Sequence, residues 1–385
     1  MDELKAMRSE IDEIDEKLLD LYARRMDVAK RIGEYKKVRG MQVFDPEREK
    51  LLLEEKIDKV KGTGLESGAT RFFELLMSHS RHEQHMLMGP GVHPDYNAYK
   101  SAMEAMRDEI PDPSVVYQGQ PGAYGEEACI NFFGESVKKS NVTTFEDVFK
   151  TLDRGEADYG VLPIENNSTG SIVQVFDLMS KYNCYMVGEK TIRIGHCLMA
   201  PEGASLDTLS DVYSHEQGFL QSEGFLAKHP AWRRNIMENT AESAKKVAES
   251  KDVSKAAIAS RRAAEIYGLS ILSEGINSNE HNHTRFVIVS KAMESRKGSD
   301  KISVMFTLRH EVGSLHRMLS CFTSRGLNLL KIESRPVAGK GWEYRFFTDF
   351  TGSLAYGNMD DVVAELIENS ESFRILGSYK ADGGA

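Results

Sequence analysis

Apolar positions recur every three or four residues from Leu4 to about Val38, which is the period of one face of an α-helix. The stripe is made of Leu4, Met7, Ile11, Ile14, Leu18, Leu21, Val28, Ile32 and Tyr35. Where it calls for another apolar residue the chain has Arg25, and Lys36 returns to nearly the same face three turns later. Because a cation on a packing face needs a partner, the pattern predicts a site for a small polyanion within a helical bundle.

Two further helices are expected in this first block, which we place at residues 1–88. Asp45 and Pro46 have the character of an N-cap followed by proline at the first helical position, so they begin the second helix. A loop is then marked by the glycines Gly62, Gly64 and Gly68. The third helix is predicted over about residues 69–88.

Polar residues also interrupt the apolar faces of these two helices. Ser80 and Gln84 share a face with Met77, and Arg48 and Glu49 open the second helix. Taken singly, each is explained equally well by a surface ion pair or a polar bundle edge. Taken together, they favour a binding site over a merely solvated face.

Arg8 and Arg25 lie on the same predicted helix but far apart. Their separation of seventeen residues is about 25 Å at 1.5 Å per residue, so they cannot grip one small molecule from the same chain. If Arg8 is a ligand, it serves the site of a second subunit. A long helix with an exposed apolar stripe also favours a homodimer or a higher homo-oligomer.

The pattern changes after a linker at residues 89–113. The segments SVVYQG, DYGVLPIEN, DVYSH, AAIAS and HTRFVIVS are strand-like and alternate with helices, which predicts an α/β domain at residues 114–291. Residues 300–380 then follow the order βαββαβ, which is the ferredoxin-like α+β arrangement. The fold class is therefore multidomain, with an all-α block, an α/β block and an α+β block.

Charge and composition exclude several classes of partner. The 385 residues carry a net charge of −10 without a strongly basic block, which argues against nucleic-acid and membrane-surface binding. No apolar run approaches the roughly 20 residues of a membrane-spanning helix. The four scattered cysteines predict a protein of the reducing cytoplasm, without a disulfide framework or a cysteine zinc site.

Three polar loops of the middle block are candidates for a second site. GQPGAYG follows one strand, SHEQ follows another, and LPIENNSTGS precedes a helix whose N-terminus can hold a carboxylate. In α/β sheets, ligands bind at the carboxyl ends of the strands. Thr284, within the segment HTRF, indicates by itself no more than β propensity.

The segments IDEIDEKLL, ARRMDVAKRIGEYK, DPERE and SHSRHEQ make the first block resemble the all-helical chorismate mutase domain. The resemblance implies eight substrate-contacting positions: Arg8 (from the partner subunit), Arg25, Lys36, Asp45, Arg48, Glu49, Ser80 and Gln84. Among these, Lys36 and Gln84 contact the ether oxygen, and Glu49 takes a hydroxyl. The rearrangement is pericyclic, so it requires no metal or cofactor, only a held conformer and stabilised charge on the breaking C–O bond.

The segments YQGQPGAY, LPIENNSTGS, YSHEQGF and NHTRF make the middle block similar to prephenate dehydratase. The resemblance implies a two-lobed fold like that of periplasmic binding proteins, with Thr284 as the catalytic threonine. It places the following residues in two loops of the cleft: Glu165, Asn166, Ser168, Ser214, His215 and Gln217. Because threonine is a poor acid, it needs exact placement or help from a carboxyl group such as that of Glu165.

The segments VGSLHRML and ESRP make the last block resemble the ACT domain of prephenate dehydratases. The implied phenylalanine-binding positions are Gly313, Ser314, Leu315, Glu333, Ser334, Arg335 and Pro336. In that family phenylalanine binds between two ACT domains. Ser314 replaces the alanine of the usual Gly-Ala-Leu, a change expected to alter affinity.

The three resemblances together imply a bifunctional chorismate mutase–prephenate dehydratase inhibited by phenylalanine, with chorismate and prephenate as substrates and no cofactor. Two alternatives remain. One is a binding module that performs no chemistry. The other is a monofunctional, phenylalanine-regulated prephenate dehydratase whose helical block serves only dimerisation.

Overall fold

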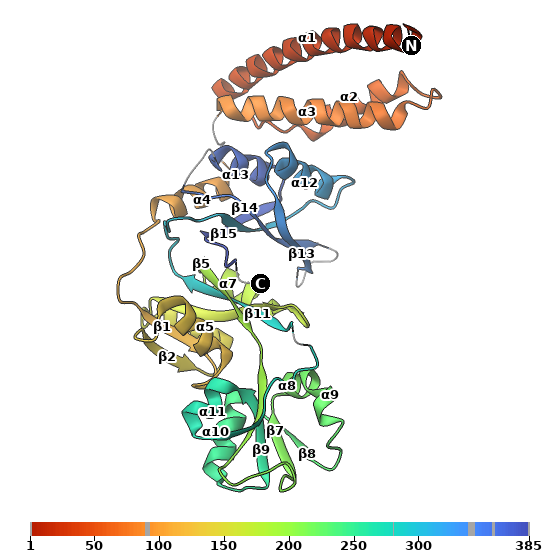
Figure 1. The fold of residues 1–385 in the computed structure, drawn as a ribbon. Coiled ribbons are helices and arrows are strands. Elements are labelled where there is room, and N and C mark those ends of the chain that lie inside the picture. The colour runs from red at the N-terminus through yellow and green to blue at the C-terminus, as the bar shows by residue number, and fades with distance from the viewer. Residues whose placement is uncertain (1, 89–92, 280, 338–342, 356–358, 384–385) are drawn as a thin grey trace. The chain divides into compact units, whose positions relative to one another are not determined.

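The computed structural model describes residues 2–88, 93–279, 281–337, 343–355 and 359–383. The chain forms two compact units (Figure 1). The first unit contains residues 1–101, 305–348 and 356–374, and the second contains residues 102–304, 349–355 and 375–385. Residues 89–92 of the predicted linker and residue 1 lie outside the described part of the chain.

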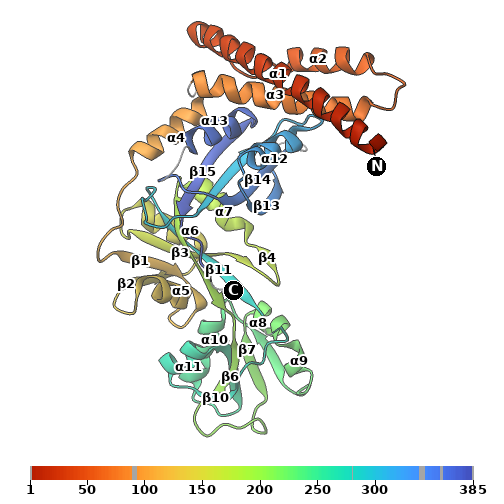
Figure 2. The ribbon, with the colours of Figure 1, turned by 45° about the horizontal axis from the view of Figure 1, so that its top comes forward.

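The N-terminal helices have these bounds: α1 (Asp2–Arg39), α2 (Pro46–Asp58), α3 (Glu66–Met88) and α4 (Pro94–Glu104). Helices α1 and α3 lie side by side (Figure 2). They approach closely at Gly33, where a Cβ atom would lie 3.1 Å from the Cα atom of Gln84. The predicted cap of α2 is confirmed, because Asp45 Oδ1 accepts a hydrogen bond from the backbone N–H of Arg48 at 3.0 Å. Gly68 was wrongly assigned to the loop, since α3 begins at Glu66.

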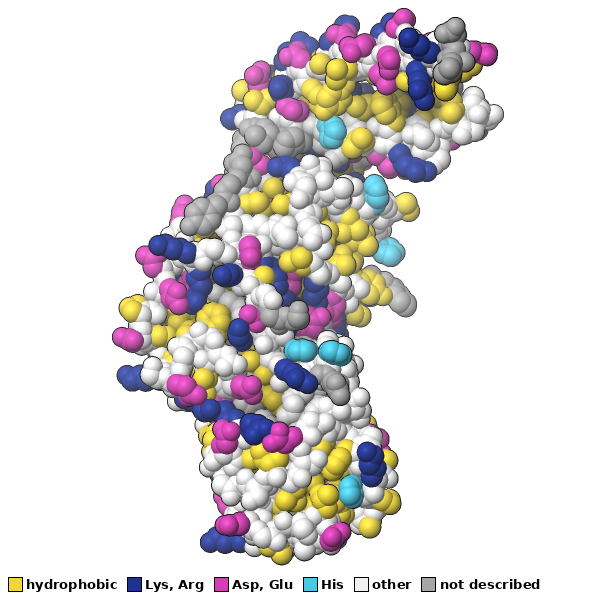
Figure 3. Space-filling view, viewed as in Figure 1, with side chains coloured by type: hydrophobic (Ala, Val, Ile, Leu, Met, Phe, Trp, Pro, Cys, Tyr) yellow, Lys and Arg dark blue, Asp and Glu magenta, His cyan; other side chains and the backbone are white. Residues whose placement is uncertain are grey.

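The predicted apolar stripe is not the face of α1 that packs within this chain. All nine residues of the stripe, from Leu4 to Tyr35, are exposed, and the buried residues of α1 are Met26, Ala29 and Gly33 instead. Apolar side chains are visible at the surface of this helical part (Figure 3). Arg25 is therefore at the edge of the packed face of α1, and the exposed stretch requires another partner.

The C-terminal residues follow the predicted order of elements: β12 (Lys301–Thr307), α12 (Ser314–Ser324), β13 (Leu329–Pro336), β14 (Tyr344–Thr351), α13 (Met359–Glu368) and β15 (Ser372–Tyr379). The four strands pair in the order β13-β14-β12-β15, and the two helices contact each other. The order βαββαβ predicted from the sequence is confirmed.

The second unit contains two sheets, each with its own hydrophobic core. The strands of the first sheet are β1 (Ser114–Gln118), β2 (Lys138–Val142), β3 (Tyr159–Asn166), β4 (Gly170–Ser171), β5 (Tyr185–Arg193) and β11 (His283–Ser290). They pair in the order β5-β11-β3-β1-β2, with β4 beside β3. The accompanying helices are α5 (Tyr124–Phe133), α6 (Phe145–Asp153) and α7 (Val173–Lys181). Strand β11 runs antiparallel to both β3 and β5, which places the start of β11 beside the end of β3.

The strands of the second sheet are β6 (His196–Ala200), β7 (Asp211–Ser214), β8 (Arg233–Ile236), β9 (Lys255–Ser260) and β10 (Ser270–Ser273), in the order β10-β6-β9-β7-β8. Its helices are α8 (Glu216–Gln221), α9 (Glu223–Leu226), α10 (Thr240–Ser250) and α11 (Arg261–Tyr267). The chain crosses between the sheets after β5 and again before β11. Among the described residues, no helix combines the length and apolar character needed to cross a membrane.

Candidate active sites

Arg25 extends from α1 to α3. Its guanidinium donates hydrogen bonds to the backbone carbonyl of Leu76, at 2.6 Å, and to the hydroxyl of Ser80. Burial lowers the pKa of Arg25, while interactions with Glu49 and Tyr22 act to raise it. Two residues predicted from separate helices, Arg25 and Ser80, are thus brought together.

Lys36 lies beside the start of α2. Its Nζ atom donates to the backbone carbonyl of Val43 at 2.6 Å. Burial lowers the pKa of Lys36, and Asp45 and Glu49 are among the acidic groups that oppose this shift. The capped start of α2 therefore supplies two carboxylates near Lys36, while the side chain of Arg48 is exposed.

Glu49 is paired with Arg81, a residue that the sequence pattern did not single out. Both carboxylate oxygens of Glu49 accept from Arg81 Nη1, with Oε2 at 2.6 Å. Arg81 is buried, and its guanidinium lies over the ring of Phe44 at 5.5 Å from the ring centre. A signal existed in the sequence, because Met77, Arg81 and Gln84 recur at helical spacing on one face of α3.

The charges around this helical site do not cancel. The cations Arg25, Lys36, Arg48 and Arg81 outnumber the carboxylates that act on them, which are those of Asp45, Glu49 and Glu368. The excess of positive charge suits a small anion. Gln84 is buried beside Gly33, and its amide oxygen has no hydrogen-bond partner within the described part of the chain. Arg8 is exposed and far along α1, as its spacing from Arg25 required.

In the second unit, Thr284 at the start of β11 pairs with Asn166 at the end of β3. Asn166 Nδ2 donates to Thr284 Oγ1 at 2.9 Å. The amide oxygen of Asn166 accepts the backbone N–H groups of Ser168, at 2.9 Å, and Thr169, at 3.0 Å. These bonds fix the orientation of the amide, and they leave Asn166 occupied by protein groups.

Glu165 lies on the other face of the same strand pair. It is the cross-strand neighbour of Arg285, and Arg285 Nη2 lies 3.2 Å from Glu165 Oε2. Since successive residues of a strand point to opposite faces, Glu165 and Thr284 face apart in this conformation. Direct help from Glu165 to Thr284 would therefore require the carboxylate to move.

Asn282 belongs to the Asn166 network, although the sequence pattern did not single it out. Its side-chain oxygen accepts from Asn166 Nδ2 at 2.8 Å and from Ser168 Oγ at 3.5 Å. Asn282 is buried, and its Nδ2 atom has no partner among the residues described. Its two-residue spacing from Thr284 was the available signal, because such residues share one face of an extended segment.

Ser214, His215 and Gln217 lie at the carboxyl end of β7, in the other sheet. Ser214 is fully buried and donates to the carbonyl of Ile258 at 2.9 Å, which points to a structural role. The ring nitrogen Nδ1 of His215 accepts the backbone N–H of Gln217 at 3.2 Å and caps α8. The structure thus brings these three residues together. Among the described residues, none of the three is in direct contact with Thr284.

A cavity of about 380 Å³ lies beside the start of α12. It is lined by Leu308, Arg309, His310, Glu311, Val312, Ser314, Leu315, Tyr344 and Phe346. Gly313, in the left-handed region at φ 82°, is the N-cap residue of α12. Two of the predicted phenylalanine-binding positions, Ser314 and Leu315, therefore line this cavity.

The predicted positions Glu333, Ser334, Arg335 and Pro336 lie on β13, outside the lining of that cavity. Arg335 Nε donates to Glu333 Oε1 at 2.9 Å. Ser334 and Pro336 are exposed on the edge strand of the sheet. This chain alone does not bring the two predicted groups into one pocket.

Known proteins resemble the chain over nearly its full length. The family described as "Chorismate mutase type II" matches residues 7–85, and "Prephenate dehydratase" matches residues 115–294. A "Bifunctional chorismate mutase/prephenate dehydratase" of Enterobacter agglomerans is 32% identical, covering 98% of this chain and 96% of its own. The protein of the same description from Aquifex aeolicus is 33% identical, covering 98% of both chains. The structure of an Arthrobacter aurescens prephenate dehydratase in complex with L-Phe has a TM-score of 0.64 and 29% identity, covering 70% of this chain and 90% of that one.

Proposed function

Because the chain belongs to the family of bifunctional chorismate mutase/prephenate dehydratases, we propose that two separate sites perform these two reactions. The helical part converts chorismate to prephenate, and the second unit converts prephenate to phenylpyruvate. The observation that carries the proposal is the group of cations that includes Arg25, which is partly buried, and Arg81, which is buried and paired with Glu49. Withdrawing cations from water would be costly in a bundle that served only dimerisation.

The mutase reaction requires a compact conformer of a dicarboxylate and stabilisation of the breaking C–O bond. The excess of positive charge at the helical site suits the two carboxylates of the substrate. Lys36 and Gln84 donate hydrogen bonds to the ether oxygen. The amide oxygen of Gln84 has no partner among the described residues, which supports an amide group that is oriented by the bound ligand. Glu49, held by Arg81, accepts a hydrogen bond from the substrate hydroxyl.

The dehydratase reaction breaks two bonds of prephenate. The ring hydroxyl leaves with a proton as water, and the ring carboxylate leaves as carbon dioxide, whose bonding electrons complete the aromatic ring. Thr284 assists the departing hydroxyl as a hydrogen-bond donor. Asn166 supports this role, because its donated hydrogen bond occupies the threonine oxygen and leaves the hydroxyl proton available.

Feedback inhibition by phenylalanine is proposed for the C-terminal block, which we assign as an ACT domain. The cavity beside α12 combines apolar walls from Leu308, Leu315 and Phe346 with nearby charged groups, which suits an amino acid with an aromatic ring. Glu333 to Pro336 lie on an edge strand, so a second copy of the block would bring them to a shared site.

A homodimer is proposed for the helical part. The exposed apolar residues of α1 supply the surface, and Arg8 lies within that surface. Pairing through α1 would deliver Arg8 to the partner subunit's Arg25 and Lys36.

The proposal is tested by giving the purified protein chorismate and, separately, prephenate, with and without phenylalanine. Formation of prephenate from the first substrate and of phenylpyruvate from the second is expected. Conversion of prephenate without conversion of chorismate would instead support a monofunctional dehydratase.

A further inference from the structure

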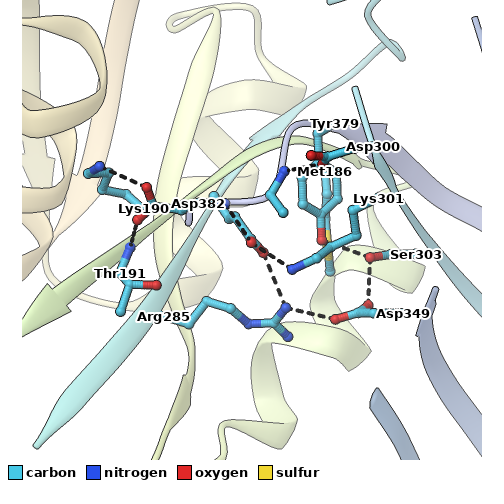
Figure 4. Close-up of polar contacts among 12 residues, drawn as sticks. Met186, Lys190, Thr191, Arg285, Asp300, Lys301, Ser303, Asp349, Tyr379 and Asp382 are labelled. Carbon is cyan, nitrogen blue, oxygen red and sulfur yellow. Dashed lines mark hydrogen bonds and ion pairs between the residues drawn. The ribbon is translucent and has the colours of Figure 1, made fainter. Parts of the chain in front are cut away.

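Arg285 is shared by three carboxylates in the second unit. Its Nη1 atom donates to Asp349 Oδ2 at 2.7 Å and to Glu189 Oε2 at 3.2 Å (Figure 4). Its Nη2 atom lies 3.2 Å from Glu165 Oε2. Arg285 directly follows Thr284 in β11. The neighbour of the proposed catalytic threonine is therefore held by Asp349, which lies outside the pair of strands β3 and β11.

The two buried carboxylates of this cluster are already balanced without Glu165. Glu189 accepts from Lys301 Nζ at 2.6 Å, so two cations, the partly buried Arg285 and the buried Lys301, face two buried anions, Glu189 and Asp349. Glu165 is the third carboxylate on Arg285, and its side chain is 35% exposed. Glu165 and Glu189 both lie 3.2 Å from the guanidinium, but water screens the more exposed Glu165, so its ion pair with Arg285 is the weaker of the two.

Asp349 is firmly positioned on its other side. Its Oδ1 atom accepts from Ser303 Oγ at 2.6 Å, and Ser303 Oγ lies 2.8 Å from the hydroxyl of Tyr379. Burial disfavours the ionised form of Asp349, yet Arg285 and Ser303 together lower its pKa. The carboxylate thus remains charged and competes with Glu165 for the guanidinium.

We propose that Arg285 is a positioning residue of the dehydratase site, and that Asp349 sets how firmly Arg285 holds Glu165. The inference rests on the proposed dehydratase function of the second unit. Without the charge of Asp349, the guanidinium is left unbalanced and binds Glu165 more tightly. Glu165, which faces away from Thr284 in this conformation, is then less able to turn toward the substrate, and the rate of the chemical step falls.

The test is Asp349→Asn, a nearly isosteric change that removes one charge. We expect kcat for prephenate dehydration to fall about tenfold or more, with KM changed less than about twofold, because misplaced catalytic groups lower the rate. Asp382→Asn is the matched control: its carboxylate belongs to the same cluster but bonds Lys190 and Thr191 instead of Arg285. It should leave kcat within about twofold of the wild type.

A double-variant comparison shows whether Asp349 acts through Glu165. If it does, Glu165→Gln and Glu165→Gln/Asp349→Asn should have nearly the same kcat. If the losses of kcat in the two single variants multiply in the double variant, Asp349 does not act through Glu165, and the proposal is overturned. If Asp349 had only a structural role, Asp349→Asn would lower the melting temperature, but kcat measured well below the melting temperature would be unchanged. This result would also overturn the proposal.

A second variant keeps the proposal testable if Asp349→Asn does not fold. Arg285→Lys retains the charge that the buried carboxylates require, but one ammonium group cannot replace the fork of the guanidinium. The ammonium group stays with Glu189 and Asp349, so Glu165 loses the contact that positions it. We therefore expect kcat to fall about tenfold in this variant too, and a normal kcat would contradict the positioning role of Arg285. If the wild-type protein makes no phenylpyruvate from prephenate, the proposed function is wrong. If the wild type makes phenylpyruvate and Asp349→Asn has the same kcat, only the proposed role of Asp349 and Arg285 is wrong.

Discussion

The amide of Asn166 donates a hydrogen bond to the hydroxyl oxygen of Thr284, with 2.9 Å between Nδ2 and Oγ1. Two backbone N–H groups, those of Ser168 and Thr169, hold the other side of the amide. The threonine oxygen is therefore an acceptor, and its proton is left for another partner. Asn166 thus has a positioning role as well as the substrate contact predicted from the sequence.

Asn166→Asp should reverse that polarity. A carboxylate accepts from the threonine hydroxyl instead of donating to it, so the proton points away from the substrate. We expect kcat for phenylpyruvate formation to fall about 100-fold, within the range for a lost general acid. The control is Asn167→Asp, whose amide contacts the backbone of His281 and His283 but not the hydroxyl of Thr284. Equal losses in both variants would contradict the assigned role.

Gln84→Glu should make the mutase dependent on pH. An ionised carboxylate repels the negative charge that develops on the ether oxygen, whereas a protonated one can donate a hydrogen bond. Chorismate turnover should be at least about 100-fold slower than in the wild type at pH 7.5 and should recover as the pH is lowered. A flat pH profile would show that Gln84 does not donate to the reacting oxygen.

Arg81→Met should weaken chorismate binding and turnover. The change removes one of the four cations and frees the carboxylate of Glu49, so kcat/KM should fall about tenfold or more. Arg81→Lys should recover part of the loss, because it keeps the charge but not the full geometry. The matched control is Arg71→Met, since Arg71 is exposed on α3 and bonds only to Ser67 among the contacts of the described residues. Similar losses at both arginines would refute a site role for Arg81.

Arg8 should act across the subunit interface. Arg8→Ala and Lys36→Ala chains should each lack mutase activity. When mixed and allowed to exchange subunits, they should regain part of it, because one site of each heterodimer then has every residue. Exchange is verified by native mass spectrometry. Verified exchange without recovered activity would mean that Arg8 does not serve the partner.

Leu315→Arg should desensitise the dehydratase to phenylalanine. A charged side chain in the cavity beside α12 opposes entry of an apolar ring, so the half-inhibiting concentration should rise at least about tenfold. Turnover without phenylalanine should be unchanged, because the inhibitor acts only by favouring the less active state. Val253→Arg, at a similarly exposed position of the second unit, is the control. Unchanged inhibition of Leu315→Arg would indicate that phenylalanine competes at the dehydratase site.

The sequence by itself determined the local elements. The cap at Asp45, the order βαββαβ and the strand that carries Thr284 all depend on residues within a few positions of one another. Periodicity and capping are short-range, so they are legible in the chain before it folds. The polar residues on the faces of the first helices could be recognised for the same reason, whereas the catalytic role of Thr284 was implied only by the resemblance to a known family.

Only the tertiary structure decided the partners of the buried charges. The pairing of Arg81 with Glu49, and of Arg285 with Asp349, joins residues that are 32 and 64 positions apart. The structure also decided that Glu165 and Thr284 face apart, that Ser214 is buried, and which face of α1 is covered. Strand register and helix packing set these outcomes. The cost of burying a charged side chain is offset by the oppositely charged side chain that the fold places beside it.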